Sequence, residues 1–135
     1  MPSKLRLDRI GDRIQQELSE MLVTGKVHDP RMSGVYVTGV KVDRELAFAD
    51  VFLSAVEGAE RAKDVLAGMG SAGSFLRHEL SQRIELRVFP RLRFHWDPTP
   101  ERADRIERLL ATLREEDTPA QADENDDDEP ADTDA

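Results

Sequence analysis

Apolar side chains recur at helical spacing in several stretches of the chain, the first of which covers residues 5–23. Its apolar positions lie three or four residues apart, which is typical of one face of an amphipathic helix. Gly25 follows and predicts the end of this helix. Arg6, Arg9 and Arg13 lie on the opposite side, close in sequence to acidic residues with which they can pair. The apolar positions are Leu7, Ile10, Ile14, Leu18, Met21 and Leu22.

Two strand-like segments come next. Residues 34–42 are rich in β-branched side chains and alternate in polarity, and residues 46–56 alternate again after a short polar turn. This pattern predicts two strands that pair as an antiparallel hairpin. By their spacing, Phe48 and Phe52 in the second strand and Phe94 further along the chain are predicted to be core residues.

Residues 85–96 predict a third strand. Pro90 cannot donate a hydrogen bond to a neighbouring strand, so the paired part is expected to begin at about Arg91. Side chains alternate across a strand, which places Arg91, Arg93 and His95 together on one face.

A glycine-rich interruption divides the helical pattern between the hairpin and the third strand. Val65, Leu66 and Met69 precede it, and the same spacing resumes at Phe75 and continues to Ile84. Three glycines within six residues indicate a break or a close backbone approach, because each costs ~1 kcal/mol relative to alanine inside a helix. We predict a sharp kink between two helices. The glycines are Gly68, Gly70 and Gly73.

A second helix that begins near Ser71 or Ser74 would offer unpaired N–H groups and a positive dipole end, with a serine as N-cap. Such a helix start is suited to binding phosphate. A helix elbow that permits close packing accounts for the glycines equally well. The glycines also spell G-x-G-x-x-G, but the dinucleotide-binding motif must follow a strand, and a helical pattern precedes Gly68.

The last helical stretch begins near Thr99, a good N-cap that is followed by Pro100. Ala103, Ile106, Leu110 and Leu113 are predicted to form its buried side. From residue 115 onward the chain has no large apolar side chain and is rich in acidic residues. We therefore expect a folded domain over residues 1–114 and a disordered acidic tail over residues 115–135. The tail resembles the start of a calcium loop at Asp123, Asn125 and Asp127, but Asp128 stands where that loop needs glycine.

Composition narrows the class of protein. A chain of 135 residues predicts one domain with a real core. It shows neither an apolar stretch long enough to span a membrane nor an N-terminal signal core, so we expect a cytoplasmic protein. The absence of cysteine excludes disulfides, thiol catalysis and cysteine zinc sites.

The formal net charge of −9 is unevenly distributed. Residues 1–114 carry all 19 basic side chains and 17 of the 28 acidic ones. Between residues 77 and 93, five arginines stand against Glu79 and Glu85 only. This cluster indicates either a surface that faces a polyanion or a solvated strip.

No catalytic constellation is visible. His28, His78 and His95 are scattered without the spacing or acidic partners of a metal site. We therefore predict no enzyme activity, no catalytic residues, no metal and no cofactor. The few aromatic residues do not support a base-stacking platform, so any nucleic-acid binding is expected through phosphate contacts and a helix terminus.

The predicted elements follow the order α-β-β-α-kink-α-β, with a further C-terminal helix. This is the order of a type II KH domain, an α+β fold with its helices on one face of a three-stranded sheet. KH domains present a G-x-x-G loop between their central helices, and Gly70-Ser71-Ala72-Gly73 occupies the equivalent place.

The chain resembles the ribosome-binding factor A family from Arg6 to about Leu113, in several motifs with matching order and spacing. The motifs are Arg6-x-x-Arg9-Ile10, Ile14-Gln15-x-Glu17-Leu18, Asp29-Pro30-Arg31, Val40-x-Val42-x-Arg44-x-Leu46-Ala47-x-Ala49-x-Val51, Ala72-Gly73-Ser74-Phe75-Leu76-Arg77 and Leu86-Arg87-x-x-Pro90-x-Leu92-x-Phe94.

This resemblance implies a KH-like fold in which an Ala-x-Gly kink replaces the usual G-x-x-G loop. The kink aligns with Ala72-Gly73-Ser74, where the glycine stands one position earlier than in the family motif. It implies a non-catalytic assembly factor that binds the free 30S ribosomal subunit, assists late maturation of the 5′ end of 16S rRNA and supports growth in the cold. We expect a monomer away from the ribosome. The predicted RNA-binding residues are Arg6, Arg9, Ser71, Ala72, Gly73, Ser74, Arg77, Arg83, Arg87, Arg91 and Arg93.

A protein-binding adaptor is the alternative. In that reading, the exposed edge of the hairpin or the last helix docks a partner, and the arginines only keep the domain soluble. Salt dependence separates the two, because binding to RNA weakens steeply as salt rises.

Overall fold

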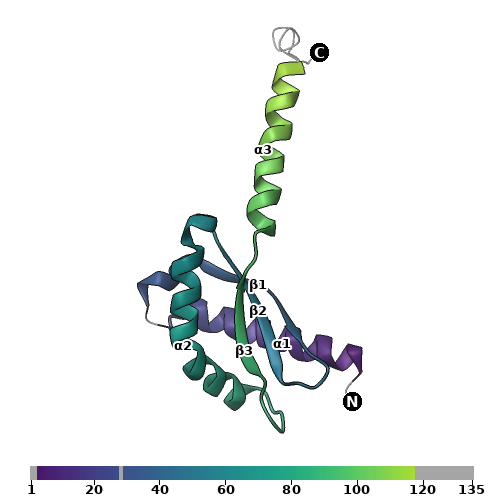
Figure 1. Ribbon diagram of the computed structural model, residues 1–135, viewed down its shortest axis with the longest axis vertical. Coiled ribbons are helices and arrows are strands. Elements are labelled where there is room, and N and C mark those ends of the chain that lie inside the picture. The colour runs from purple at the N-terminus through teal and green to yellow at the C-terminus, as the bar shows by residue number, and fades with distance from the viewer. Residues whose placement is uncertain (1–2, 28, 118–135) are drawn as a thin grey trace, which may run out of the picture. The chain divides into compact units, whose positions relative to one another are not determined.

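The computed structural model describes residues 3–27 and 29–117 and has the element order α1, β1, β2, α2, β3, α3 (Figure 1). The chain divides into two units, residues 1–98 and residues 99–135, which we describe separately. The α+β class agrees with the prediction, and so does this order, except that one helix stands where two were predicted. His28 and residues 118–135 lie outside the described residues. The second of these segments contains the residues that resemble a calcium loop and most of the predicted tail.

Helix α1 runs from Lys4 to Val23 as its apolar spacing predicts. The Ser3 side chain caps its start by accepting a hydrogen bond from the backbone N–H of Arg6 at 3.2 Å. At the other end, Gly25 has φ +79°, and the Lys26 N–H returns to the Met21 carbonyl at 3.0 Å. This is a Schellman cap, in which glycine is favoured because its φ is positive.

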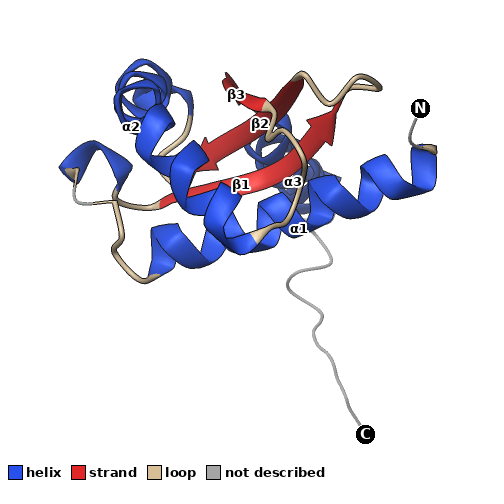
Figure 2. Cartoon of the chain, turned by 90° about the horizontal axis from the view of Figure 1, so that it is seen from below, coloured by secondary structure: helices blue, strands red, loops and turns tan. Residues whose placement is uncertain are grey.

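The sheet has the strand order β1-β2-β3. Strands β1 (Val35–Val42) and β2 (Phe48–Ala55) form the predicted antiparallel hairpin, with an irregularity between Val37 and Gly39. Strand β3 (Arg91–Trp96) pairs in parallel with β2 and begins where Pro90 predicts. Figure 2 shows the three strands beside α1 and α2.

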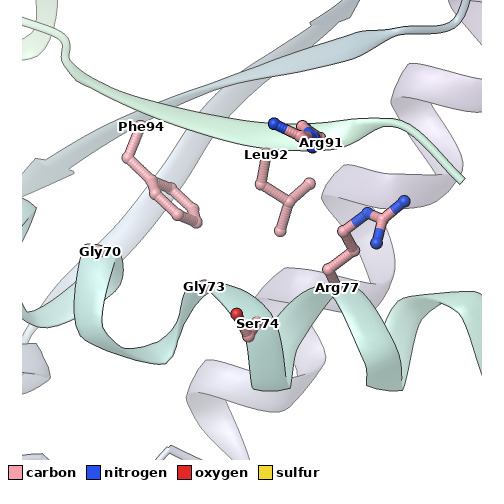
Figure 3. A pocket seen from close by; sticks show the side chains of 7 residues that line it. All are labelled: Gly70, Gly73, Ser74, Arg77, Arg91, Leu92 and Phe94. Carbon is pink, nitrogen blue, oxygen red and sulfur yellow. The ribbon is translucent and has the colours of Figure 1, made fainter.

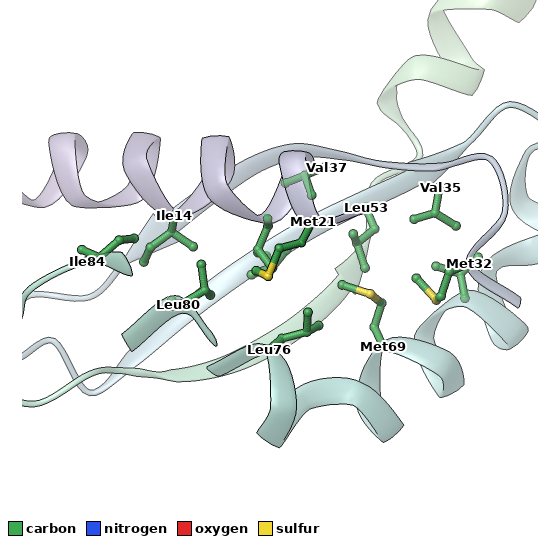
Figure 4. Packing of buried hydrophobic residues seen from close by; sticks show 14 of the residues in the cluster. Ile14, Met21, Met32, Val35, Val37, Leu53, Met69, Leu76, Leu80 and Ile84 are labelled. Carbon is green, nitrogen blue, oxygen red and sulfur yellow. The ribbon is translucent and has the colours of Figure 1, made fainter. Parts of the chain in front are cut away.

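One side of the sheet packs against α1 and α2 (Figure 4). The core residues of β2 are alternate positions, and they meet fully buried side chains of both helices. Phe48 and Phe52 occupy the other alternate positions of β2, on the opposite side of the sheet. The prediction that they are core residues is therefore wrong. Phe94 does pack against the core. The fully buried side chains on the covered side include Ile14, Leu18, Met21, Val51, Leu53, Val65, Met69, Leu76 and Leu80.

Helix α2 is continuous from Ala62 to Arg83, so the predicted separation into two helices is wrong. The chain bends without ending the helix, as the change in direction of α2 in Figure 1 shows. Only one of the three glycines lies at a close approach. A Cβ on Gly68 would lie 2.8 Å from the Met32 sulfur, whereas one on Gly73 would be in ordinary contact with the Phe94 ring at 3.7 Å and one on Gly70 would meet nothing within 4 Å.

The second unit contains helix α3, from Thr99 to Asp117. This helix extends past residue 114, which the sequence predicts to be the end of the folded domain. The disorder of the acidic tail stays a prediction. The prediction of a buried side on this helix is wrong, because Ile106, Leu110 and Leu113 are 56%, 45% and 53% exposed, and Ala103 is exposed as well.

Candidate nucleic-acid interface

A hollow of about 410 Å³ lies between α2 and strand β3. Figure 3 shows Arg91, Leu92 and Phe94 on the strand, with Phe94 pointing toward the glycine-containing segment of the helix. Because Gly70 and Gly73 have no side chains, the helix backbone itself forms part of the wall. The lining residues are Gly70, Gly73, Ser74, Arg77, Arg91, Leu92 and Phe94.

Two further hollows adjoin the first. The second shares Ser74 and Arg77 with it and extends over the loop between α2 and β3. The third shares Leu86, Arg87 and Val88 with the second and reaches Arg6 on α1 and residues 45–47 of the hairpin turn. We call the three together the basic groove, because Arg6, Arg77, Arg87 and Arg91 line it and outnumber its one acidic lining residue, Glu45.

The arginines of the basic groove keep their positive charge available. Within residues 3–27 and 29–117, no ion pair engages any of the four. Arg77 donates from Nη2 to the Phe89 carbonyl at 2.6 Å and from Nε to the Pro90 carbonyl at 3.1 Å. These acceptors are neutral, so Arg77 holds the loop before β3 without losing its charge. Such a groove is suited to an anionic backbone.

Arg83 differs from the arginines of the basic groove in its partners, and its contact with RNA stays a prediction. Arg83 bridges the two helices, because its Nη1 lies 3.1 Å from the Glu17 carboxylate and 3.5 Å from that of Glu20. Glu79 is a third partner at 3.9 Å. The hydrogen bond from Arg83 and a further one from Arg13 hold the pKa of Glu17 below its usual range, against the opposing effect of burial. Arg83 is therefore surrounded by carboxylates.

Arg93 lies on the side of the sheet that faces away from the core. The predicted clustering of Arg91, Arg93 and His95 on one face is confirmed by their pairing with Phe48, Asp50 and Phe52 respectively. Arg93 makes two hydrogen bonds to Asp50, at 2.8 and 3.1 Å, and its guanidinium lies 4.0 Å from the centre of the Phe48 ring.

Asp50 also contacts His95 Nε2 at 2.8 Å. Burial alone would raise the pKa of the Asp50 carboxyl, but the hydrogen bonds from Arg93 and His95 outweigh it, and the pKa is lowered. The Asp50 carboxyl therefore stays ionised, and its negative charge offsets the positive charge of Arg93 on this side of the sheet.

The serines near the glycines are not N-caps, because α2 begins at Ala62 and passes through both positions. Ser74 lines the basic groove together with Gly73. Ser71 and Ala72 line another hollow with Lys26 and Phe75. Arg9 is exposed on α1, three residues from Arg6. RNA contact by any of these residues stays a prediction, but a helix terminus at the glycines is excluded.

Sequence reasoning missed Asp50 as the partner of Arg93 and His95. A signal was present, because Asp50 alternates with Phe48 and Phe52, and a carboxylate between two aromatic positions marks their face as one that meets solvent. It also missed Leu92 and Phe94 as walls of the basic groove, which lies between segments that are distant in sequence.

Two further findings concern only the described residues. No group of three or more histidine and acidic side chains is placed to hold a metal ion. None of the helices combines the length and apolar character that crossing a membrane requires.

Comparisons with known proteins agree on one family. The family model described as ribosome-binding factor A matches residues 6–110. A ribosome-binding factor A from Hahella chejuensis is 38% identical over 128 residues, covering 90% of this chain and 93% of its own length. One from Nitrosomonas europaea is 40% identical over 105 residues, covering 78% and 89%.

Solved structures show the same fold. The crystal structure of ribosome-binding factor A from Thermus thermophilus superposes with a TM-score of 0.59 at 22% identity, over 67% of this chain and 93% of that one. The solution structure of a Thermotoga maritima protein gives a TM-score of 0.60 at 24% identity, over 70% and 90%.

Proposed function

The chain belongs to the ribosome-binding factor A family, and on that premise we propose that it is a non-catalytic assembly factor that binds the free small ribosomal subunit. It acts in the cytoplasm as a monomer and assists late maturation of 16S rRNA at its 5′ end. Its absence is expected to matter most in the cold, where RNA that has folded incorrectly rearranges slowly.

The basic groove is the observation that carries this proposal. Four arginines line it, and among the described residues no carboxylate pairs with them. RNA offers closely spaced phosphates, and each arginine that neutralises one releases a counterion. We assign phosphate contacts to Arg6, Arg87 and Arg91, while Arg77 shapes the groove through its bonds to Phe89 and Pro90.

The test measures binding of the full chain to purified small subunits by co-sedimentation over a series of salt concentrations. The variant is Arg87→Gln/Arg91→Gln. Arg77 is left intact, because its loss would also loosen the loop before β3. We expect weaker binding at low salt and a slope of log Kd against log salt that is smaller by about two, since each phosphate contact contributes about one.

A matched control changes net charge equally. Arg105 and Arg108 pair within α3 with Glu101 and Asp104, so Arg105→Gln/Arg108→Gln removes two positive charges outside the groove. We expect this control to bind with the wild-type slope. Equal losses in both variants would show that only net charge matters and would reject the groove as the contact surface.

The role in maturation has its own test. Cells that lack the protein are expected to accumulate 16S rRNA with an unprocessed 5′ end, more at low temperature than at high. Primer extension on small-subunit RNA measures this fraction. Complementation with Arg87→Gln/Arg91→Gln should restore processing poorly, whereas the α3 control should restore it fully. Normal 5′ ends in cells without the protein would contradict the proposal.

One observation favours the adaptor as a second candidate. Helix α3 exposes a stripe formed by Ile106, Leu109, Leu110 and Leu113, which a protein partner could cover. Docking of this kind would persist at high salt and would be lost in Ile106→Ser/Leu110→Ser. If that variant abolishes subunit binding while Arg87→Gln/Arg91→Gln does not, the adaptor function replaces RNA binding.

A further inference from the structure

The side of the sheet that faces away from the core carries rings and charges in a fixed arrangement. We call it the open face and define it by alternate positions of the three strands, as the strand register places them. Its residues are Tyr36 and Lys41 of β1, Phe48, Asp50 and Phe52 of β2, and Arg91, Arg93 and His95 of β3.

Two stacked pairs form on the open face. The His95 ring lies over Phe52 with centroids 5.2 Å apart and planes 28° apart. The Arg93 guanidinium lies 4.0 Å from the centre of the Phe48 ring. Phe48 and Phe52 are four residues apart on one strand, so the two pairs are separated by roughly 13 Å along it, at about 3.3 Å per residue.

Asp50 holds both the Arg93 guanidinium and the His95 ring in position. Its carboxylate accepts two hydrogen bonds from Arg93 and lies 2.8 Å from His95 Nε2. A planar group that is already held in place loses little conformational entropy when a ligand stacks on it. The side chains of Arg93 and His95 are still 49% and 43% exposed, so each can meet a ligand.

The chemistry of the open face selects an anionic ligand with planar groups. Lys41, Arg91 and Arg93 outnumber the carboxylates of Asp50 and of Asp97, which accepts a hydrogen bond from the Thr38 hydroxyl at 2.6 Å, and this excess favours a polyanion. Unpaired RNA bases stack on aromatic rings and on arginine guanidinium planes. An acidic peptide would satisfy the charge but would make no use of two flat surfaces.

We propose that the open face is a second RNA-binding surface, on which unpaired bases stack against Arg93 and His95. The proposal rests on RNA as the target of the protein, but the open face differs from the basic groove in mechanism and shares only Arg91 with it. The basic groove contacts phosphates, whereas the open face binds bases. Together they would engage single-stranded RNA on two sides of the domain.

The test uses the full chain and two fluorescently labelled probes, a short oligouridine and an abasic strand with the same number of phosphates. Fluorescence anisotropy gives Kd for each probe over a series of salt concentrations. The variant Phe48→Leu/Phe52→Leu removes the rings that support both stacked pairs. We expect about tenfold weaker binding of oligouridine at every salt concentration, with an unchanged salt slope and unchanged binding of the abasic strand.

Two further variants keep the result interpretable. Val23→Ala/Val56→Ala trims two exposed apolar side chains elsewhere and should bind both probes as the wild type does. Arg93→Lys keeps the charge but loses the flat guanidinium; it should weaken binding of oligouridine and not of the abasic strand. This second variant reports on stacking even if the double variant folds poorly.

The proposal is overturned if the open-face variants bind oligouridine like the wild type, or if they weaken binding of both probes equally. Its failure differs from failure of the basic groove. A smaller dependence of Kd on salt in Arg87→Gln/Arg91→Gln supports phosphate contacts in the basic groove, whatever the result for the open-face variants. Conversely, base-dependent binding that the open-face variants abolish supports the open face even if the groove arginines have no effect.

Discussion

The two sides of the one sheet differ in what their side chains do, and strand β2 shows this residue by residue. Val51 and Leu53 point to the covered side, where α1 and α2 exclude water completely. Asp50 and Phe52 point to the open face and are only half-buried. Burial on one side supplies the free energy of folding, which leaves the other side free to hold charges and rings for binding.

The largest expected difference comes from neighbouring residues on β2. Leu53→Ala should lower the free energy of unfolding by about 2–5 kcal/mol, because it removes a fully buried side chain and leaves a cavity. Phe52→Leu on the open face should cost less than about 1.5 kcal/mol. Urea unfolding followed by circular dichroism measures both. Equal losses would show that the open face is part of the core.

Two glycines give the next contrast. A Cβ on Gly11 would lie 2.8 Å from the Val40 carbonyl oxygen, whereas one on Gly39 would meet nothing within 4 Å. Gly11→Ala should destabilise by about 1–3 kcal/mol, because the backbones of α1 and β1 must move apart. Gly39→Ala should stay within about 0.5 kcal/mol of the wild type. Thermal unfolding ranks the two, and a stable Gly11→Ala variant would contradict close packing there.

The comparison also extends to charge. Arg87→Gln in the basic groove should reduce the salt slope of subunit binding by about one. Arg93→Gln should change the slope less, since Asp50 already neutralises Arg93. Co-sedimentation of the two single variants at matched salt concentrations measures this. A larger change of slope for Arg93→Gln would place the principal phosphate contacts on the open face.

The smallest effect concerns pH. Because the folded-state pKa of Asp50 is lowered, its ion pairs stabilise the protein above the ordinary value of 3.8, and this contribution is lost as pH falls through the folded-state pKa. Asp50→Asn should cost up to about 1 kcal/mol at neutral pH, and the difference from the wild type should vanish in acid. Asp12→Asn, at an exposed position of α1, is the control. A difference that persists in acid would exclude ion pairing as its cause.

Local patterns predicted most of the fold. Helix α1, the hairpin and the start of β3 at Arg91 follow from apolar spacing, from Gly25 and from Pro90, each of which acts within a few residues. Helix α2 departs from its local pattern, because apolar side chains before and after the glycines pack into the same core, which local propensity cannot anticipate. Helix α3 has an amphipathic pattern, but the pattern does not specify what covers its apolar stripe.

By itself, the sequence determined the order of the elements, the family resemblance and the excess of arginine around β3, because each of these depends on residues that are close together in the sequence. Only the tertiary structure decided which arginines keep a free charge. Arg83 meets Glu17 across 66 residues of chain, and Arg93 meets Asp50 across 43, while Arg87 and Arg91 form no ion pair with any of the described residues. The physical reason is that ion pairing depends on distance in space, which the fold sets.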